Sequence, residues 1–294
     1  MIEIGKYLEQ EKAKIDRALA ERMPRSAPAA VVDAMRYSLE AGGKRLRPIL
    51  ALAVAETLGA EDESIIDVAC ALEYIHTYSL IHDDLPAMDN SDLRRGKPAC
   101  HRVYGEAVAI LAGDALLTLA FETIACYGSR AGREKRAIRI TGELAGAAGV
   151  EGMIGGQVLD LEAEGAAPDA AQVDKIAIMK TGALLRAAVV CGAIAANASE
   201  KQIKVLNAYA SRIGPAFQII DDLLDYESTT AELGKPAGAD QILSKATYPA
   251  LLGSEEARRR AEALYIDAVS ALDKLDRPSG LLKELANKMI YRTR

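Results

Sequence analysis

Apolar residues recur at intervals of three and four along almost the whole chain, and this helical period is the feature that most constrains its fold. No stretch shows the apolar and polar alternation of a convincing strand. The chain has no Trp and only two Phe, and it is rich in Ala and Leu, which favours helices over sheets. An all-α fold is therefore predicted.

Several helix boundaries follow from local signals. Pro28 can open a helix that Gly42 ends, and Pro48 can open the almost wholly apolar "PILALAVAETLG". Ser64 can cap the next helix, whose stripe runs to Asp83. With 294 residues, 50% of them hydrophobic, and no Pro/Ser/Gly-rich linker, residues 1–294 are predicted to form a single all-α domain. Further helices are expected around 105–127, 131–164, 170–197, 200–226 and 254–274.

Composition excludes several classes of function. The net charge of -6 and the pI of about 5.3 disfavour nucleic acid as a partner. The N-terminal segment is too polar for a signal peptide, and the longest uncharged apolar run is too short for a membrane span. The four Cys show no C-x-x-C spacing, so they are interpreted as reduced thiols of a cytoplasmic protein.

The first acidic cluster ends the stripe that begins after Ser64. Asp83 and Asp84 follow an apolar helical run, and Asp89 would fall about 120° from Asp83 on an unbroken helix. Pro86 forbids an unbroken helix here, and a local bulge could bring Asp89 back toward the other two carboxylates. A solvated helix end is the simpler interpretation of this segment taken alone.

A second acidic cluster makes a metal site the better interpretation. In "FQIIDDLLDYE", Asp221, Asp222 and Asp225 share one helix face, with Gln218 one turn earlier. Like charges at this spacing destabilise an isolated helix by about 0.2–0.5 kcal/mol per pair, and partial burial raises that cost. Mg²⁺ can compensate, because it takes a few carboxylate oxygens and shares its remaining positions with water and substrate phosphates.

Basic residues in loops and helix ends supply the other half of a diphosphate site, since Arg forks and Lys point charges bind such groups. They occur in "GGKRLRP", "LRRGKP", "MKTG" and "LGKPAGAD". Neither a Walker motif nor G-x-G-x-x-G is present. Two acidic clusters and several basic residues among apolar helices indicate a substrate that is a phosphate ester with an apolar hydrocarbon part. If its diphosphate departs, the hydrocarbon part can be left as a carbocation.

At this point the sequence resembles the short-chain trans-prenyltransferases (polyprenyl synthases), and among them the bacterial farnesyl diphosphate synthases. The resemblance rests on "GGKRLRP", "HTYSLIHDDLPAMD", "LRRGKP", "MKTG", "FQIIDDLLD" and "LGKPAGADQILSKATYP", in that order between residues 40 and 250. It implies an all-α isoprenoid synthase fold around a central cavity, a homodimer, and three Mg²⁺ per active site, which Mn²⁺ could replace. The implied reaction joins isopentenyl diphosphate head-to-tail to C5 and C10 allylic diphosphates.

The resemblance also assigns roles to individual residues. The metal ligands would be Asp83, Asp84, Asp89, Asp221, Asp222 and Asp225, and all of these except Asp225 count with Lys180 as catalytic. Isopentenyl diphosphate would bind Gly43, Lys44, Arg47, His76 and Arg95. The allylic diphosphate would bind Arg94, Lys180, Thr181, Gln218, Lys235 and Lys245.

Chain length is expected to depend on residues one to two turns before Asp83. Ser79 lies on the face of Asp83, whereas Tyr78 lies about 140° around the helix, so wheel geometry alone does not place Tyr78 in the cavity. An aromatic residue at the position of Tyr78, together with the D-D-x-x-x-x-D spacing, resembles the farnesyl (C15) class, and C15 is predicted.

Other functions stay open on the sequence. They are a geranylgeranyl (C20) diphosphate synthase, a class I terpene cyclase, and a non-catalytic subunit that binds prenyl diphosphates. The cyclase usually carries an N-D-x-x-S-x-x-x-E-like second motif, whereas residues 218–228 carry a second Asp-Asp-x-x-Asp. A di-iron bundle would need two Glu-x-x-His motifs, and only Glu73 and His76 supply one.

Overall fold

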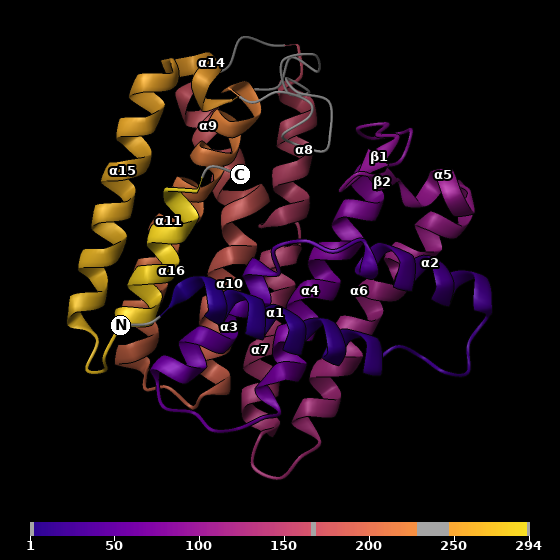
Figure 1. Ribbon diagram of the computed structural model, residues 1–294, viewed down its shortest axis with the longest axis horizontal. Coiled ribbons are helices and arrows are strands. Elements are labelled where there is room, and N and C mark those ends of the chain that lie inside the picture. Colours follow the sequence, from indigo (N-terminus) through magenta and orange to yellow (C-terminus); the bar gives the residue numbers. More distant parts are fainter. Residues whose placement is uncertain (1–2, 166–168, 228–246, 293–294) are drawn as a thin grey trace.

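The computed structural model describes residues 3–165, 169–227 and 247–292, and it is built almost wholly from helices (Figure 1). The α-helices are α1 Ile4–Glu21, α2 Ala29–Glu40, α3 Leu46–Thr57, α4 Ile65–Asp83, α5 Cys100–Tyr104, α6 Glu106–Gly128, α7 Glu134–Ala148, α8 Met153–Ala163, α9 Ala170–Ile176, α10 Ala183–Ala195, α11 Glu200–Glu227, α14 Tyr248–Leu252, α15 Ser254–Ala271 and α16 Gly280–Ile290. A π-helical segment, Ala177–Gly182, joins α9 to α10, and a 3₁₀ turn, Leu272–Lys274, follows α15. The predicted all-α class is confirmed.

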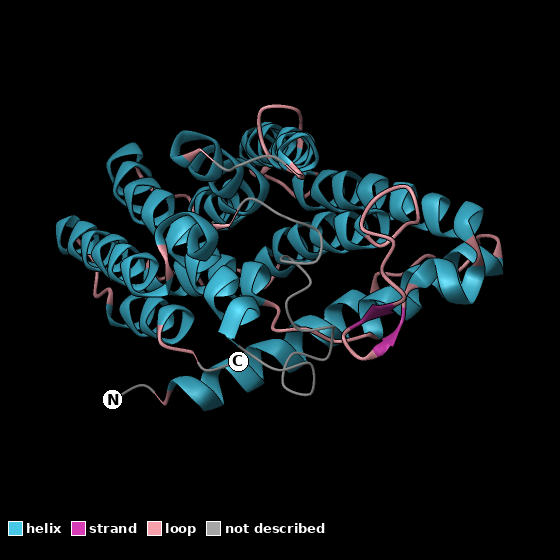
Figure 2. Ribbon diagram, turned by 90° about the horizontal axis from the view of Figure 1, so that it is seen from above, coloured by secondary structure: helices cyan, strands magenta, loops and turns pink. Residues whose placement is uncertain are grey.

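Helices α3 and α10 form the centre of the core. Both are buried almost all round, and α10 packs against α3, α4, α7 and α11. The apolar "PILALAVAETLG" therefore lies in the core, as expected for a helix without a polar face. Helices α4 and α11 flank this centre, and their C-terminal ends lie at the same end of the molecule, uppermost in Figure 1 and facing the viewer in Figure 2. The two aspartate clusters are thus carried to one end of the bundle.

Several helix boundaries differ from the expected ones. Helix α3 begins at Leu46, two residues before Pro48, because proline is tolerated within the first turn of a helix. Ser64 caps nothing with its side chain. Its hydroxyl donates to Asp62 Oδ1 at 2.7 Å instead. The expected helix over 131–164 is two helices, broken between Ala148 and Met153, where a Cβ on Gly152 would lie 2.1 Å from a backbone oxygen.

Two further differences concern the site. The expected helix over 170–197 contains the π-helical segment Ala177–Gly182, and such segments are frequent at functional sites. Strands β1 (Leu93–Arg94) and β2 (Lys97–Pro98) form a two-residue antiparallel hairpin where no strand was expected. The two residues of its turn, Arg95 and Gly96, both have positive φ, as tight hairpin turns require.

Among the described residues, two helical stretches are long and apolar enough to cross a membrane by length and composition, Glu106–Gly128 and Ala170–Ala195. In the second, 67% of the most apolar window is buried inside the protein, as in a core helix, which passes the same test. In the first only 44% is buried, so α6 presents part of its apolar surface outward.

Candidate active site

The first aspartate cluster sits where α4 ends. Asp83 is the last residue of the helix, and after Pro86 the chain turns back so that the Asp89 N–H donates to the Asp83 carbonyl oxygen at 2.9 Å. The chain is thus returned toward Asp83 by a turn after the end of the helix, in place of a bulge within it. Asp84 is 2% exposed, and its carboxylate accepts hydrogen bonds from Arg94 Nε at 3.0 and 3.1 Å. Burial raises the pKa of Asp84, and Arg94 opposes that shift.

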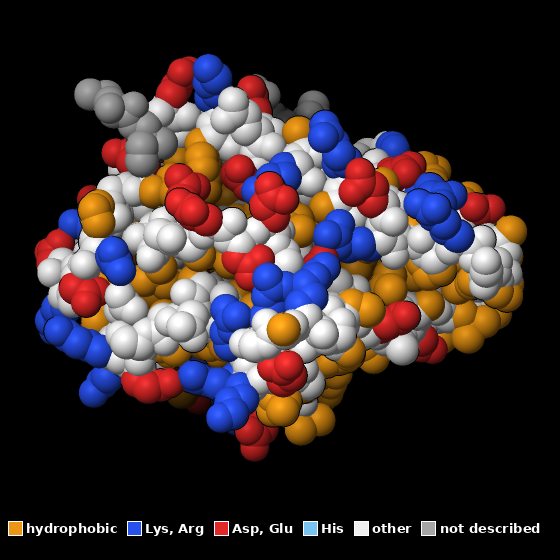
Figure 3. Space-filling view, turned by 90° about the horizontal axis from the view of Figure 1, so that it is seen from below, with side chains coloured by type: hydrophobic (Ala, Val, Ile, Leu, Met, Phe, Trp, Pro, Cys, Tyr) orange, Lys and Arg blue, Asp and Glu red, His pale blue; other side chains and the backbone are white. Residues whose placement is uncertain are grey.

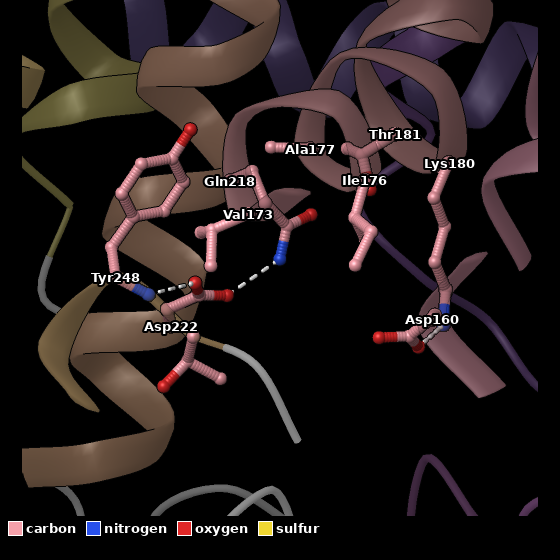
Figure 4. Close-up of a pocket in the computed structure, with 10 residues that line it drawn as sticks. Asp160, Val173, Ile176, Ala177, Lys180, Thr181, Gln218, Asp222 and Tyr248 are labelled. Atoms are coloured by element: carbon pink, nitrogen blue, oxygen red, sulfur yellow. Dashed lines mark hydrogen bonds and ion pairs between the residues drawn. The ribbon is translucent and has the colours of Figure 1, made fainter. Parts of the chain in front are cut away.

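The second cluster lies near the C-terminal end of α11. Asp222 and Asp225 are buried, whereas the Asp221 side chain is 44% exposed. Asp222 accepts at both oxygens: from Gln218 Nε2 at 2.7 Å and from the Tyr248 backbone N–H at 3.2 Å (Figure 4). The shared face predicted for Gln218 and this cluster is thus observed as a direct contact.

A cavity of about 90 Å³ adjoins the second cluster. Figure 4 shows Lys180 and Asp160 on one side of it and Asp222, Gln218 and Tyr248 on the other. Lys180 and Thr181 both belong to the π-helical segment. The cavity is lined by Asp160, Val173, Ile176, Ala177, Lys180, Thr181, Gln218, Asp222, Thr247 and Tyr248.

Helix α8 contacts Lys180 at its side-chain nitrogen and at its backbone, and neither contact was predicted from the sequence. Asp160 Oδ2 lies 2.5 Å from Lys180 Nζ. One turn earlier, Gly156 packs so closely that a Cβ there would lie 2.2 Å from the Lys180 backbone nitrogen. A signal was present in "MIGGQVLDLEA", because Asp160 falls on the same helix face as Met153, Gly156 and Ala163, and a carboxylate on such an apolar face needs a buried partner.

A separate basic cluster comprises Lys44, Arg47, His76 and Arg95. Burial lowers the pKa of Arg47 to about 10 and lowers that of His76 well below its usual value, and the charges of Arg47 and Arg95 lower the His76 pKa further. Arg95 lies against Gly43, where a Cβ would be 2.5 Å from its guanidinium carbon, and it donates to the Gly42 carbonyl. Within the described residues, Arg47 and Arg95 form no ion pair with a carboxylate. Cations that are half-buried close to one another, as Arg47 and Arg95 are, favour an anionic ligand.

The neighbouring Arg45 points elsewhere. It has a left-handed backbone (φ 50°) and is 3% exposed, with hydrogen bonds to Asp16 at 2.7 Å and Glu73 at 2.6 Å. It is therefore part of a structural network between α1, α3 and α4. Because Glu73 is engaged by Arg45, it does not act with His76 as the Glu-x-x-His pair of a di-iron site.

The C-terminal segment also reaches the site, a contact not predicted from sequence. Arg292 Nη2 lies 2.5 Å from Asp221 Oδ1, and its guanidinium carbon stacks 3.9 Å from the centroid of the Phe217 ring. Its side chain is only 6% exposed. Lys44 lies close enough to Arg292 and Asp221 for their charges to affect its pKa, which burial lowers most.

The expected chain-length residues lie on α4. Tyr78 is 6% exposed, and its ring packs edge-on against His82 with centroids 5.7 Å apart. Burial raises the pKa of Tyr78 to about 12, and its hydroxyl has no hydrogen-bond partner among the residues that the structure describes. The Ser79 hydroxyl donates to the His76 carbonyl at 2.8 Å. Lys235 and Lys245 lie outside the described residues.

A family model for polyprenyl synthetases matches residues 28–277. The chain therefore belongs to the polyprenyl synthetase family, and it is a prenyltransferase with the isoprenoid synthase fold. The predicted family is confirmed. Membership implies isopentenyl and allylic diphosphates as substrates, and the family generally depends on Mg²⁺.

Individual relatives and a solved structure are similar to the chain over most of its length. The farnesyl diphosphate synthase of Geobacillus stearothermophilus is 46% identical over 268 residues, which cover 91% of this chain and 90% of the relative. Geranylgeranyl pyrophosphate synthase 3, chloroplastic, of Arabidopsis thaliana is 46% identical over 269 residues, covering 90% and 75%. The crystal structure of an FPP/GFPP synthase from Zymomonas mobilis, in its apo form, matches with a TM-score of 0.84 at 38% identity and covers 99% of both chains.

Proposed function

We propose that this chain condenses isopentenyl diphosphate with C5 and C10 allylic diphosphates and releases farnesyl diphosphate as its main product. The observation that carries the proposal is that two aspartate clusters lie at one end of the bundle, near the half-buried Arg47 and Arg95, which form no ion pair with a carboxylate in the described part of the chain. The resemblance of residues 78–89 to the farnesyl class and the similarity to the Geobacillus farnesyl diphosphate synthase support the C15 product.

The aspartates fit the metal that the family uses. Carboxylate oxygens are the hard donors that Mg²⁺ prefers, and it takes only one or two of them when substrate phosphates complete its shell. Within residues 3–165, 169–227 and 247–292, no group of three or more Asp, Glu, His or Cys side chains is arranged so that it could hold a metal ion by itself. Asp83, Asp84 and Asp89 would hold the ions from α4, and Asp221, Asp222 and Asp225 from α11. We propose three Mg²⁺ per site, with Mn²⁺ as a substitute.

The protein residues would divide the binding of the two diphosphates. Lys180, Thr181, Gln218 and Arg94 would bind the allylic diphosphate, together with Lys235 and Lys245. Gly43, Lys44, Arg47, His76 and Arg95 would bind isopentenyl diphosphate. Bound Mg²⁺ would neutralise the charge that develops on the departing diphosphate.

The reaction itself needs no side-chain nucleophile. The allylic C–O bond breaks, and its electron pair leaves with the diphosphate. The double bond of isopentenyl diphosphate then attacks the allylic cation, and the new C–C bond leaves a tertiary cation. Loss of a proton to the released diphosphate forms the new double bond. The apolar helices around the site would exclude water, which would otherwise capture the cation.

A product assay tests the proposal. Purified protein with Mg²⁺, isopentenyl diphosphate and a C5 or C10 starter should form mainly the C15 diphosphate, resolved by chromatography and mass spectrometry. A main C20 product would instead identify the geranylgeranyl alternative. Turnover of a prenyl diphosphate without isopentenyl diphosphate would indicate a cyclase, and no turnover would indicate a binding subunit.

We also propose a cytoplasmic homodimer. Large apolar side chains are exposed along α6 (Ile110 44%, Leu111 57%) and α8 (Ile154 45%, Val158 48%), and a second copy could cover them. Figure 3 shows Lys/Arg and Asp/Glu side chains interspersed over the lower face, whereas hydrophobic ones gather toward the side that carries α5 and α6. The four cysteines are free, as in a reducing compartment. Sedimentation equilibrium would give the subunit number.

The KM values for the two substrates should be raised by different substitutions. Arg95→Ala is expected to raise KM for isopentenyl diphosphate about 10- to 100-fold, the range for a hydrogen bond to a charged group. Lys180→Ala should raise KM for the allylic substrate by a similar factor. Steady-state kinetics with each substrate varied in turn would measure both values. Equal shifts of both KM values in either variant would contradict the division.

Isopentenyl diphosphate should bind with proton uptake at His76. In the free protein, burial and the charges of Arg47 and Arg95 depress the His76 pKa, so the imidazole is neutral at pH 7. A bound diphosphate offsets those cationic charges and raises the pKa, and affinity should therefore increase as pH falls toward the pKa of the complex. Calorimetry in buffers of different ionisation enthalpy would measure the uptake, and His76→Gln should abolish it. Equal uptake in that variant would place the proton elsewhere.

A further inference from the structure

Asp222 is oriented by Tyr248, which is not among the site residues expected from the sequence. Tyr248 is the first residue of α14, so its N–H has no acceptor within the helix. It donates instead to Asp222 Oδ2 at 3.2 Å, while Gln218 occupies Oδ1. The direction of this carboxylate therefore depends on where the Tyr248 backbone lies.

The Tyr248 side chain is anchored on the side away from Asp222. Its ring is 2% exposed, and its hydroxyl donates to Asp174 Oδ1 at 2.7 Å. Burial and the bond to Asp174 raise the pKa of Tyr248, so the hydroxyl keeps its proton and remains a donor. Figure 4 shows the backbone nitrogen of Tyr248 directed to Asp222 and the hydroxyl at the opposite end of the side chain.

Arg260 completes the anchor from α15. Its Nη2 lies 2.7 Å from both oxygens of Asp174, and its guanidinium carbon lies 5.5 Å from the centroid of the Tyr248 ring. Asp174 belongs to α9, so three separate elements meet at these side chains. Asp174, Tyr248 and Arg260 are called the Tyr248 brace below. Arg260 and Asp174 do not line the cavity, and their side chains are 38% and 34% exposed.

We infer that the Tyr248 brace is a positioning device for the second aspartate cluster. It fixes the Tyr248 N–H, which in turn holds Asp222 in the orientation needed for binding Mg²⁺ and diphosphate. The inference rests on the proposed function of that cluster. Loss of the brace should therefore reduce Mg²⁺ affinity or activity. Removing a residue that orients a metal-binding group typically lowers metal affinity or activity about 10- to 100-fold.

The test compares arginines that follow one another on α15. Arg260→Ala removes the brace, whereas Arg258→Ala and Arg259→Ala remove exposed ion pairs to Glu227 and Glu256. Arg260→Ala and Tyr248→Phe should each lower kcat about 10-fold or more, with KM for isopentenyl diphosphate unchanged. The two control variants should match the unmodified protein. Arg260→Lys should lower kcat less than Arg260→Ala does, since Lys keeps the charge near Asp174 but not the planar guanidinium over the Tyr248 ring.

A second readout does not depend on turnover. Inorganic diphosphate and Mg²⁺ should raise Tm, and the Mg²⁺ concentration for half of this increase should be higher in Arg260→Ala and Tyr248→Phe than in the control variants. Tm without ligand shows separately whether the fold is weakened. An unshifted Mg²⁺ midpoint would overturn the inference, even if ligand-free Tm falls.

A double-mutant cycle locates the effect at Asp222. If the brace acts through this carboxylate, Tyr248→Phe should shift the midpoint no further once Asp222→Asn is present. An undiminished effect in that background would make the brace a general structural contact. Failure of the proposed function is distinguishable, because Asp222→Asn alone would then leave both the Mg²⁺ midpoint and kcat unchanged.

Discussion

Asp83→Asn and Asp221→Asn are each expected to lower kcat about 100- to 1,000-fold, the range found when one charge-stabilising group is removed from an active site. The reason is that charge on the diphosphate develops fully only as its C–O bond breaks, so a missing carboxylate weakens the transition state more than the bound substrate. Steady-state kinetics at saturating substrate would measure the loss. A chelator should abolish activity and Mg²⁺ should restore it.

Asp33→Asn provides the matched control. Asp33 lies on the surface of α2, with its side chain 54% exposed, and pairs only loosely with Arg36 at 3.6 Å. Its replacement should leave kcat unchanged. Asp221→Asn also removes the contact with Arg292, so its Tm must be compared with that of Arg292→Ala. Near-normal turnover of either site variant at normal Tm would rule out the two-cluster interpretation.

Tyr78→Ala is expected to shift the main product from C15 toward C20 and longer chains. The growing tail should extend away from the diphosphates along α4, and Tyr78 is a large side chain in the core five residues before Asp83. Its removal leaves a space that prenyl carbons can fill. Product analysis by chromatography would show the shift, with the Mg²⁺ dependence little changed.

Tyr78→Phe separates the size of this side chain from its hydroxyl. The hydroxyl is buried and has no hydrogen-bond partner within the described parts of the chain, so its loss should not reduce stability, and the product should stay C15. Tyr78→Ala should lower the free energy of unfolding by about 3–5 kcal/mol, as for other aromatic residues truncated in a core. Assays should therefore run well below its Tm. An active Tyr78→Ala protein that still stops at C15 would place the floor of the pocket elsewhere, for instance at Ile75, which is fully buried on the same helix.

Much of the site was predictable because its signals are local. The 3.6-residue period places Asp221, Asp222 and Asp225 on one face with Gln218, whatever the rest of the chain does. Pro86 cannot continue a helix, so a turn that returns Asp89 toward Asp83 was foreseeable. The roles of the basic residues were assigned from the resemblance to a known family, since the sequence does not indicate where a single basic side chain in a loop lies in space.

The sequence by itself determined the all-α class and the position of each acidic cluster on its helix, because both depend on neighbours within a few residues. Only the tertiary structure decided which charges meet. Arg45 and Arg47 are two residues apart, yet Arg45, with its left-handed backbone, contacts Asp16 and Glu73, while Arg47 lies half-buried beside His76. Asp160 contacts Lys180 across 20 residues of chain, and Arg260 contacts Asp174 across 86. Such contacts depend on how whole helices pack, and local periodicity contains no information about that packing.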